Sequence, residues 1–182
     1  MKAPERLETR RLVLRPYIDS DFEAFSLLLN DDSISKNHYL TENQQILKEE
    51  QSIFFSIINS YSSPQPILAW AICNKENEAF VGTCGLKPLK DMEAIECFYA
   101  LLPTYRKNGY AIESMLKLLE FSFNDLKILK IVIFVHPNNT RIWKVAERIG
   151  MKYMGQLKHK SIVPKAMFFS IDNKEYKVQR FH

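Results

Sequence analysis

The stretch YALLPTYRKNGYAIESMLKLLEF, Tyr99 to Phe121, decides the fold, because an apolar strand-like run gives way to a long helical pattern. Two basic residues, Arg106 and Lys107, stand just before Gly109 at the start of that helix. The first backbone N–H groups of a helix have no internal acceptor, and the helix dipole adds about half a positive charge there. The stretch therefore predicts a turn that can bind an anion such as phosphate.

Gly109 has two interpretations at this point. It leaves room for an anion to approach the backbone closely, or it only relieves strain in a strand-to-helix turn. The pattern has no second glycine and no Lys-Ser/Thr ending, which disfavours a nucleotide P-loop and a dinucleotide-binding fingerprint.

The rest of the chain predicts an α+β fold with a mixed sheet. The expected elements, in order, are a strand at 11–17, helices at 20–31 and 41–59, strands at 67–74, 79–86 and 94–102, a helix at 109–126, a strand at 130–135, a helix that ends at 150, and two or three strands after 152. Asp19 or Ser20 is expected to cap the first helix, and Asn138 or Asn139 the last.

Length and composition favour one soluble domain spanning residues 1–182. The net charge of +4 suits an anionic ligand but is too small to indicate nucleic acid. We expect no membrane partner, because no apolar run approaches membrane-spanning length. The charged N-terminus and three unpaired cysteines, Cys73, Cys84 and Cys97, suggest a cytoplasmic protein with buried thiols. The four histidines show no ligand spacing, so we expect no metal.

Three segments resemble the GNAT N-acetyltransferases. RKNGYA at 106–111 is similar to their Arg/Gln-x-x-Gly-x-Gly/Ala motif, which receives the pyrophosphate of acetyl-coenzyme A. LETRRLVLRPYIDSDFEAF at 7–25 and NNTRIWKVAERIGMKYMG at 138–155 resemble the RimJ/RimL-type branch, which acetylates α-amino groups of ribosomal and other proteins and sometimes small amines. The resemblance covers nearly the whole chain. It implies the GNAT acyl-CoA N-acyltransferase fold, with a mostly antiparallel central sheet flanked by helices.

The resemblance also implies which residues bind acetyl-CoA. It assigns the pantetheine arm and thioester to the strand backbone and the diphosphate to the turn that follows; these residues are Tyr99, Ala100, Leu101 and Leu102, then Arg106, Lys107, Asn108, Gly109, Tyr110 and Ala111. Asn139 corresponds to an asparagine that hydrogen-bonds the pantetheine arm, although a plain helix cap is the alternative. Lys107 replaces a glycine often found in the motif, which we expect to be tolerated if its φ is negative.

Glu96 is the candidate general base. It lies on an otherwise apolar strand, where burial would raise its pKa toward the working range. The alternative from the residues alone is an exposed glutamate, or one paired with Arg or Lys. The resemblance favours the base, since the family has a Glu-x-x-Tyr pattern here, matched by Glu96 and Tyr99.

The chain departs from its relatives at two positions. Ile142 and Ala146 stand where many relatives have a serine and a tyrosine, so neither can protonate the thiolate. A non-catalytic acyl-CoA-binding module therefore remains an alternative to the enzyme. The resemblance places an acceptor loop at 33–40, with His38 and Tyr39 as candidate substrate residues.

The leading hypothesis is an acetyl-CoA-dependent N-acetyltransferase acting on a protein or peptide N-terminus. At pH 7, neutralising an α-amino group costs about 1.4 kcal/mol, against about 4.6 kcal/mol for a lysine side chain. A small-molecule amine, as in antibiotic acetyltransferases, is the third possibility. Both a monomer and a homodimer are compatible with the sequence.

Overall fold

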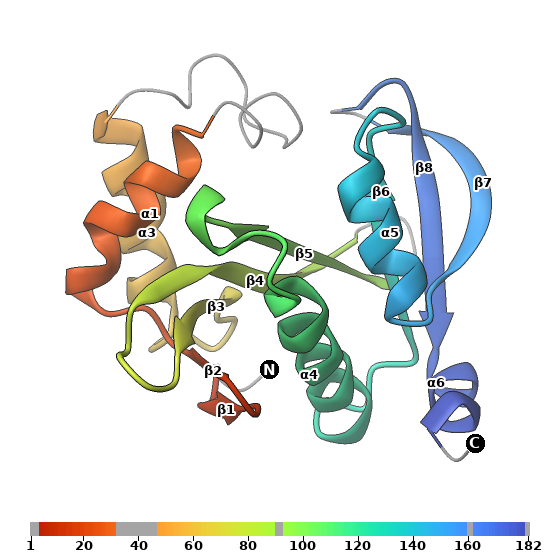
Figure 1. Cartoon of the computed structure of the whole chain (residues 1–182), viewed down its shortest axis with the longest axis horizontal. Helices are drawn as coiled ribbons and strands as arrows, with labels where there is room; N and C mark the ends of the chain where they lie inside the picture. The colour runs from red at the N-terminus through yellow and green to blue at the C-terminus, as the bar shows by residue number, and fades with distance from the viewer. Residues whose placement is uncertain (1–3, 32–46, 90–92, 160–161, 181–182) are drawn as a thin grey trace. The chain divides into compact units, whose positions relative to one another are not determined.

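The computed structural model describes residues 4–31, 47–89, 93–159 and 162–180 (Figure 1). The chain forms two compact units, Met1–Gly85 with Tyr99–Lys117, and Leu86–Phe98 with Leu118–His182. The expectation of a single domain over residues 1–182 stays a prediction. Neighbouring strands are hydrogen-bonded in the order β1-β2-β3-β4-β5-β6-β8-β7.

The first unit begins with two short strands and two helices. These are β1 (Leu7–Glu8), β2 (Leu12–Arg15), the 3-10 turn η1 (Asp19–Asp21), α1 (Phe22–Leu29) and α3 (Leu47–Ser60). β2 pairs antiparallel with β1 on one side and with β3 (Leu68–Asn74) on the other. β4 (Phe80–Pro88) and β5 (Ile95–Leu101) follow along the chain. The predicted strands at 67–74, 79–86 and 94–102 are therefore confirmed, whereas β1 was not predicted.

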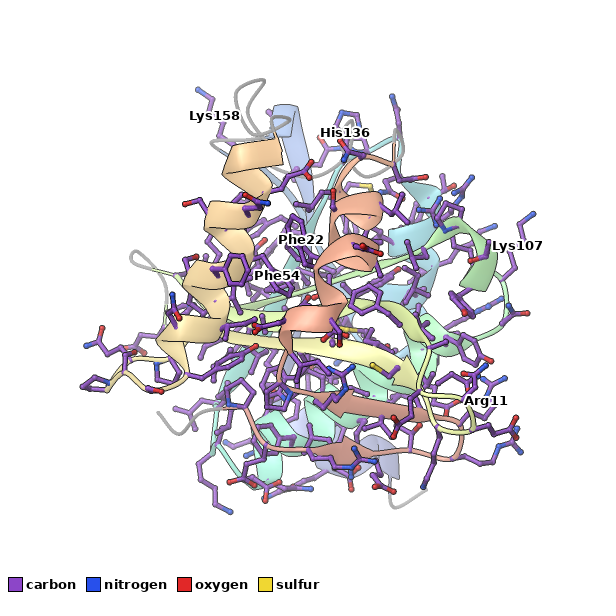
Figure 2. The ribbon with its side chains drawn as sticks, turned by 90° about the vertical axis from the view of Figure 1, so that its left-hand side faces the viewer. Arg11, Phe22, Phe54, Lys107, His136 and Lys158 are labelled. Atoms are coloured by element: carbon purple, nitrogen blue, oxygen red, sulfur yellow. The ribbon has the colours of Figure 1, made fainter. Side chains whose placement is uncertain are left out.

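In the first unit, α1 and α3 lie side by side (Figure 1), and aromatic side chains pack between them. Phe54 of α3 lies 5.5 Å from the ring of Phe22 and 5.2 Å from that of Phe25, measured between centroids. Figure 2 shows Phe22 and Phe54 on these adjacent helices. Tyr17 contacts Phe54 edge to face, with the centroids 5.5 Å apart. The apolar periodicity of both helices is satisfied by this cluster.

The cap predicted for α1 is wrong. The helix begins after Asp21, and neither Asp19 nor Ser20 caps it. Asp21 is nearly buried and accepts two hydrogen bonds from Arg15, of 2.7 and 2.8 Å, and a third of 3.0 Å from the backbone N–H of Ile18. A buried carboxylate needs such partners, and Asp21 is the N-cap residue of α1, although its side chain makes no capping hydrogen bond.

The helix α4 (Tyr110–Asn124) follows a short 3-10 turn, η3 (Pro103–Tyr105). The prediction of a helix at 109–126 is confirmed to within two residues at its end. Four apolar side chains of α4 are fully buried: Met115, Leu118, Leu119 and Phe123.

The second unit is built on β6 (Lys130–Val135), which is buried from Ile131 onward, as predicted for a strand covered on both faces. β6 runs parallel to β5 and antiparallel to β8 (Ile162–Asp172), and β8 pairs antiparallel with β7 (Lys152–His159). The predicted mixed, mostly antiparallel sheet is confirmed.

Two helices complete this unit. α5 (Thr140–Arg148) was predicted, and Gly150 ends it with a φ of +89°. α6 (Asn173–Arg180) was not predicted, and its Tyr176 packs on Phe123 with ring centroids 4.9 Å apart. No helix in the described part of the chain has the length and apolarity needed to cross a membrane. The three cysteines are buried free thiols, as predicted.

Candidate functional site

The turn between η3 and α4 contains two residues with left-handed backbone. Lys107 has a φ of +66° and Gly109 a φ of +79°. The condition under which lysine was expected to be tolerated, a negative φ, is therefore not met at Lys107. A non-glycine residue in this region costs about 1–2 kcal/mol. Backbone whose φ alternates in sign in this way is typical of anion-binding concavities.

The first turn of α4 presents backbone donors. Its first internal hydrogen bond runs from the N–H of Glu113 to the carbonyl of Gly109, at 3.1 Å. The N–H groups of Tyr110, Ala111 and Ile112 have no acceptor among the residues that the structure describes. Together with the dipole of a 15-residue helix, these three amides form a place where a phosphate group can bind.

Arg106 has a structural role in this turn. Its Nε donates to the carbonyl of Leu101 at 2.9 Å, and its Nη2 to Oδ1 of Asp31 at 2.8 Å. The guanidinium therefore ties the turn to the end of β5, and its charge is offset by Asp31. Lys107, in contrast, is exposed on the outside of the turn (Figure 2).

The C-terminal part of β5 packs closely against β4. A Cβ atom on Gly82 would lie 2.1 Å from the carbonyl oxygen of Ala100, so only glycine fits at this approach. The N–H of Leu102 donates to Val81 and its carbonyl accepts from Tyr105, both at 3.0 Å. The N–H of Leu102 is therefore engaged within the protein, and coenzyme binding by the backbone of Tyr99 to Leu102 stays a prediction.

Glu96 is buried, with 5% of its surface exposed. It sits in the short parallel ladder that pairs Ile95 with Ile131 and Glu96 with Val132. The ladder ends at Glu96, so within the described part of the second unit Cys97 and Phe98 are not paired with β6. Burial raises the pKa of the Cys97 thiol to about 12, and the neighbouring Glu96 carboxylate adds to the rise. The exposed alternative for Glu96 is therefore wrong.

Asn139 is the N-cap of α5. Its side-chain Oδ1 accepts from the N–H of Ile142 at 3.3 Å, and its own N–H donates to the carbonyl of His136 at 2.8 Å. The cap alternative is confirmed, and the choice between Asn138 and Asn139 falls to Asn139. The side-chain amide of Asn139 has no acceptor among the described residues, so a role in coenzyme binding stays a prediction.

The other residues singled out in the sequence lie on α5 or outside the described part of the chain. Ala146 is buried and Ile142 is half-buried on α5, and neither offers a proton. His38 and Tyr39 lie outside the described residues. The described residues contain no group of three or more His, Cys, Asp or Glu that could hold a metal ion.

Sequence reasoning missed a cluster at the start of α4. Oε1 of Glu113 accepts from the Thr9 hydroxyl at 2.6 Å and from the Arg11 N–H at 2.8 Å, and its Oε2 accepts from Nε of Arg11 at 2.7 Å. Burial acts to raise the pKa of Glu113, but these hydrogen bonds outweigh it and hold the pKa below its usual value. An acidic residue in the first turn of a helix is a recognisable signal, but it does not reveal a partner 102 residues away.

Solved structures share this fold. The acetyltransferase (GNAT family) from Bacillus anthracis superposes with a TM-score of 0.79 at 19% identity, covering 93% of this chain and 99% of that one. RimJ of Mycobacterium smegmatis, in complex with CoA-disulfide, superposes with a TM-score of 0.78 at 18% identity, covering 96% and 91%.

Sequence relatives agree with the fold. The uncharacterized N-acetyltransferase YoaA of Bacillus subtilis (strain 168) is 26% identical over 153 residues, covering 84% of this chain and 85% of YoaA. The uncharacterized N-acetyltransferase p20 of Bacillus licheniformis is 26% identical over 177 residues, covering 94% and 98%. The acetyltransferase (GNAT) domain model matches residues 11–152. The predicted resemblance is thus confirmed: the chain belongs to the GNAT family and is an N-acetyltransferase.

Proposed function

We propose that this enzyme uses acetyl-CoA to acetylate the α-amino group of a protein or peptide N-terminus. The observation that carries the coenzyme assignment is the set of three first-turn amides of α4 without an acceptor among the described residues. Tyr110 and Ala111 belong to the motif at 106–111 that resembles the diphosphate-binding motif of the family, and Ile112 follows it directly. The family as a whole uses acetyl-CoA, and the similar RimJ structure contains a CoA derivative.

The chain's own residues fit this coenzyme. The amides of Tyr110 and Ala111, with those of the preceding turn, would bind the diphosphate, because backbone donors at a helix start suit a group with several anionic oxygens. The backbone of Tyr99 to Leu101 would hold the pantetheine arm. The bound coenzyme supplies the thioester from which the acetyl group is transferred.

Glu96 would accept the proton of the attacking amine, directly or through a water. Its position supports this role, since Glu96 lies on β5 three residues before Tyr99, where the proposed pantetheine-binding backbone begins. A single carboxylate base removes a proton more easily from an α-amino group, whose pKa is about 8, than from a lysine side chain, whose pKa is about 10.4. Ile142 and Ala146 cannot supply a proton, so we assign protonation of the leaving thiolate to water.

The proposal also names the chemical class of the acceptor amine. The fold similarity to RimJ supports a peptide N-terminus, and a small-molecule amine is the other acceptor class. The apolar residues at 142 and 146 favour the second candidate function, a module that binds acyl-CoA without turning it over.

We also place the protein in the cytoplasm, which the three free thiols support.

Calorimetric titration with acetyl-CoA and a thiol-release assay test the proposal together. The acceptors are peptides with a free α-amino group, the same peptides blocked at the N-terminus but containing lysine, and a panel of small amines. We expect micromolar coenzyme binding and turnover confined to free N-termini. Binding without turnover on any acceptor would indicate the module, and turnover on small amines alone would refute the acceptor assignment.

A further inference from the structure

We infer that Arg11 is a further coenzyme-binding residue, which holds the diphosphate together with the first turn of α4. This inference rests on the proposed coenzyme site. The motif at 106–111 does not include Arg11, which comes from the loop between β1 and β2. The two segments are nearly a hundred residues apart in sequence, and both belong to the first unit.

Arg11 is held in one orientation by the start of α4. Its backbone N–H and its Nε both donate to the carboxylate of Glu113, at 2.8 and 2.7 Å. Its guanidinium carbon lies 4.6 Å from the centre of the Tyr110 ring. An arginine fixed by an ion pair and by an aromatic ring loses little conformational entropy when it binds a ligand.

The free end of the guanidinium adjoins the proposed diphosphate site. Nη2 of Arg11 lies 3.4 Å from the position that a Cβ atom would take on Gly109. Gly109 has no Cβ, and the amides that follow it have no acceptor among the described residues. Because Gly109 directly precedes these amides, we expect an anionic group that binds to them to come within reach of Nη2.

The donors of Arg11 are available for such a ligand. Within the described part of the chain, only its Nε and its backbone N–H have a hydrogen-bond acceptor, and neither Nη group has one. Arg106 differs, because its Nε and Nη2 are both engaged within the protein. The side chain of Arg11 is 37% exposed, so a ligand can reach it.

The electrostatics point the same way. A cation beside the start of a helix is repelled by the helix dipole, and here Glu113 compensates. Two parallel N–H bonds to a diphosphate would use the planar fork of arginine, a geometry that a lysine ammonium cannot reproduce.

The test compares the binding of CoA and of 3′-dephospho-CoA by calorimetry. The variant Arg11→Gln should weaken the binding of both ligands by the same factor, about ten- to a hundredfold, as expected for lost hydrogen bonds to a charged group. Arg10→Gln is the matched control, because Arg10 is exposed and makes no hydrogen bond or ion pair with the described residues. Thr9→Val loosens the hold on Glu113 without touching the guanidinium. Both controls should bind within threefold of the wild type.

Each other outcome overturns the inference. A loss confined to CoA would move the contact to the 3′-phosphate, and Arg11→Gln binding like the wild type would remove Arg11 from the site. An equal loss in Thr9→Val would reduce Arg11 to a structural role. If Arg11→Gln does not fold, Arg11→Lys replaces it, and normal binding by that variant would refute the bidentate contact. If the wild type binds neither ligand, the proposed coenzyme site fails, whatever Arg11 does.

Discussion

Replacing Gly109 by valine separates the role of the turn in folding from its role in binding. At a φ of +79°, a residue with a side chain costs at least about 1–2 kcal/mol. For a chain of this size that corresponds to a fall in melting temperature of about 2–8 °C. The added Cβ would lie 3.4 Å from Nη2 of Arg11, which is ordinary contact, so the protein itself can accommodate it.

The effect on the coenzyme should be much larger. The side chain would occupy the space in front of the first-turn amides, and the loss of two hydrogen bonds to a charged group costs about 3–6 kcal/mol. We therefore expect acetyl-CoA binding to weaken by at least a hundredfold. Calorimetric titration measures the binding, and a thermal melt of the same sample measures the stability.

Gly155 provides the matched control for this experiment. Its φ is +110°, and a Cβ atom there would have nothing within 4 Å. Gly155→Val should therefore lose stability through the same kind of backbone strain while binding acetyl-CoA normally. Normal binding by Gly109→Val, or an equal loss of binding in both variants, would refute the assignment of the diphosphate to this turn.

Three further predictions concern Glu96, Glu113 and the thiols. Glu96→Gln should lower turnover by about a hundredfold or more and leave acetyl-CoA affinity unchanged. The control is Glu93→Gln, because Glu93 is exposed. A parallel loss of affinity in Glu96→Gln would show that Glu96 is not the base. The lowered pKa of Glu113 means that its carboxylate stabilises the fold above pH 4.5, the ordinary value, and that this contribution disappears as the pH falls through the folded-state pKa. Denaturant unfolding should therefore give the wild type a larger free energy of unfolding than Glu113→Gln at pH 7, and this difference should shrink below pH 4.5. A difference that does not change with pH would contradict the ion pair. Burial raises the pKa of Cys73 to about 11 and that of Cys97 to about 12, so both thiols should resist a disulfide reagent at pH 8 until the protein is unfolded; rapid labelling of the native protein would contradict their burial.

Local patterns predicted most of the elements. α4 and β6 follow from the spacing of apolar residues, because a helix or a buried strand must present its apolar side chains to a core. The cap of α5 was predicted to within one residue, Asn138 or Asn139, since a cap involves only neighbouring residues, and the structure has Asn139 there. α6 was missed because its eight residues are mostly polar, and its packing depends on Tyr176 meeting Phe123.

The sequence alone determined that a glycine-containing turn opens a helix after β5, and that this turn resembles the diphosphate motif of the family. Only the tertiary structure decided how the charges around it are used. Arg106 pairs with Asp31, 75 residues away, and Arg11 pairs with Glu113, 102 residues away. Which arginine keeps donors for a ligand depends on contacts between distant segments, and no local pattern of residues records them. The same holds for Lys107, whose left-handed backbone is imposed by the path of the chain into α4.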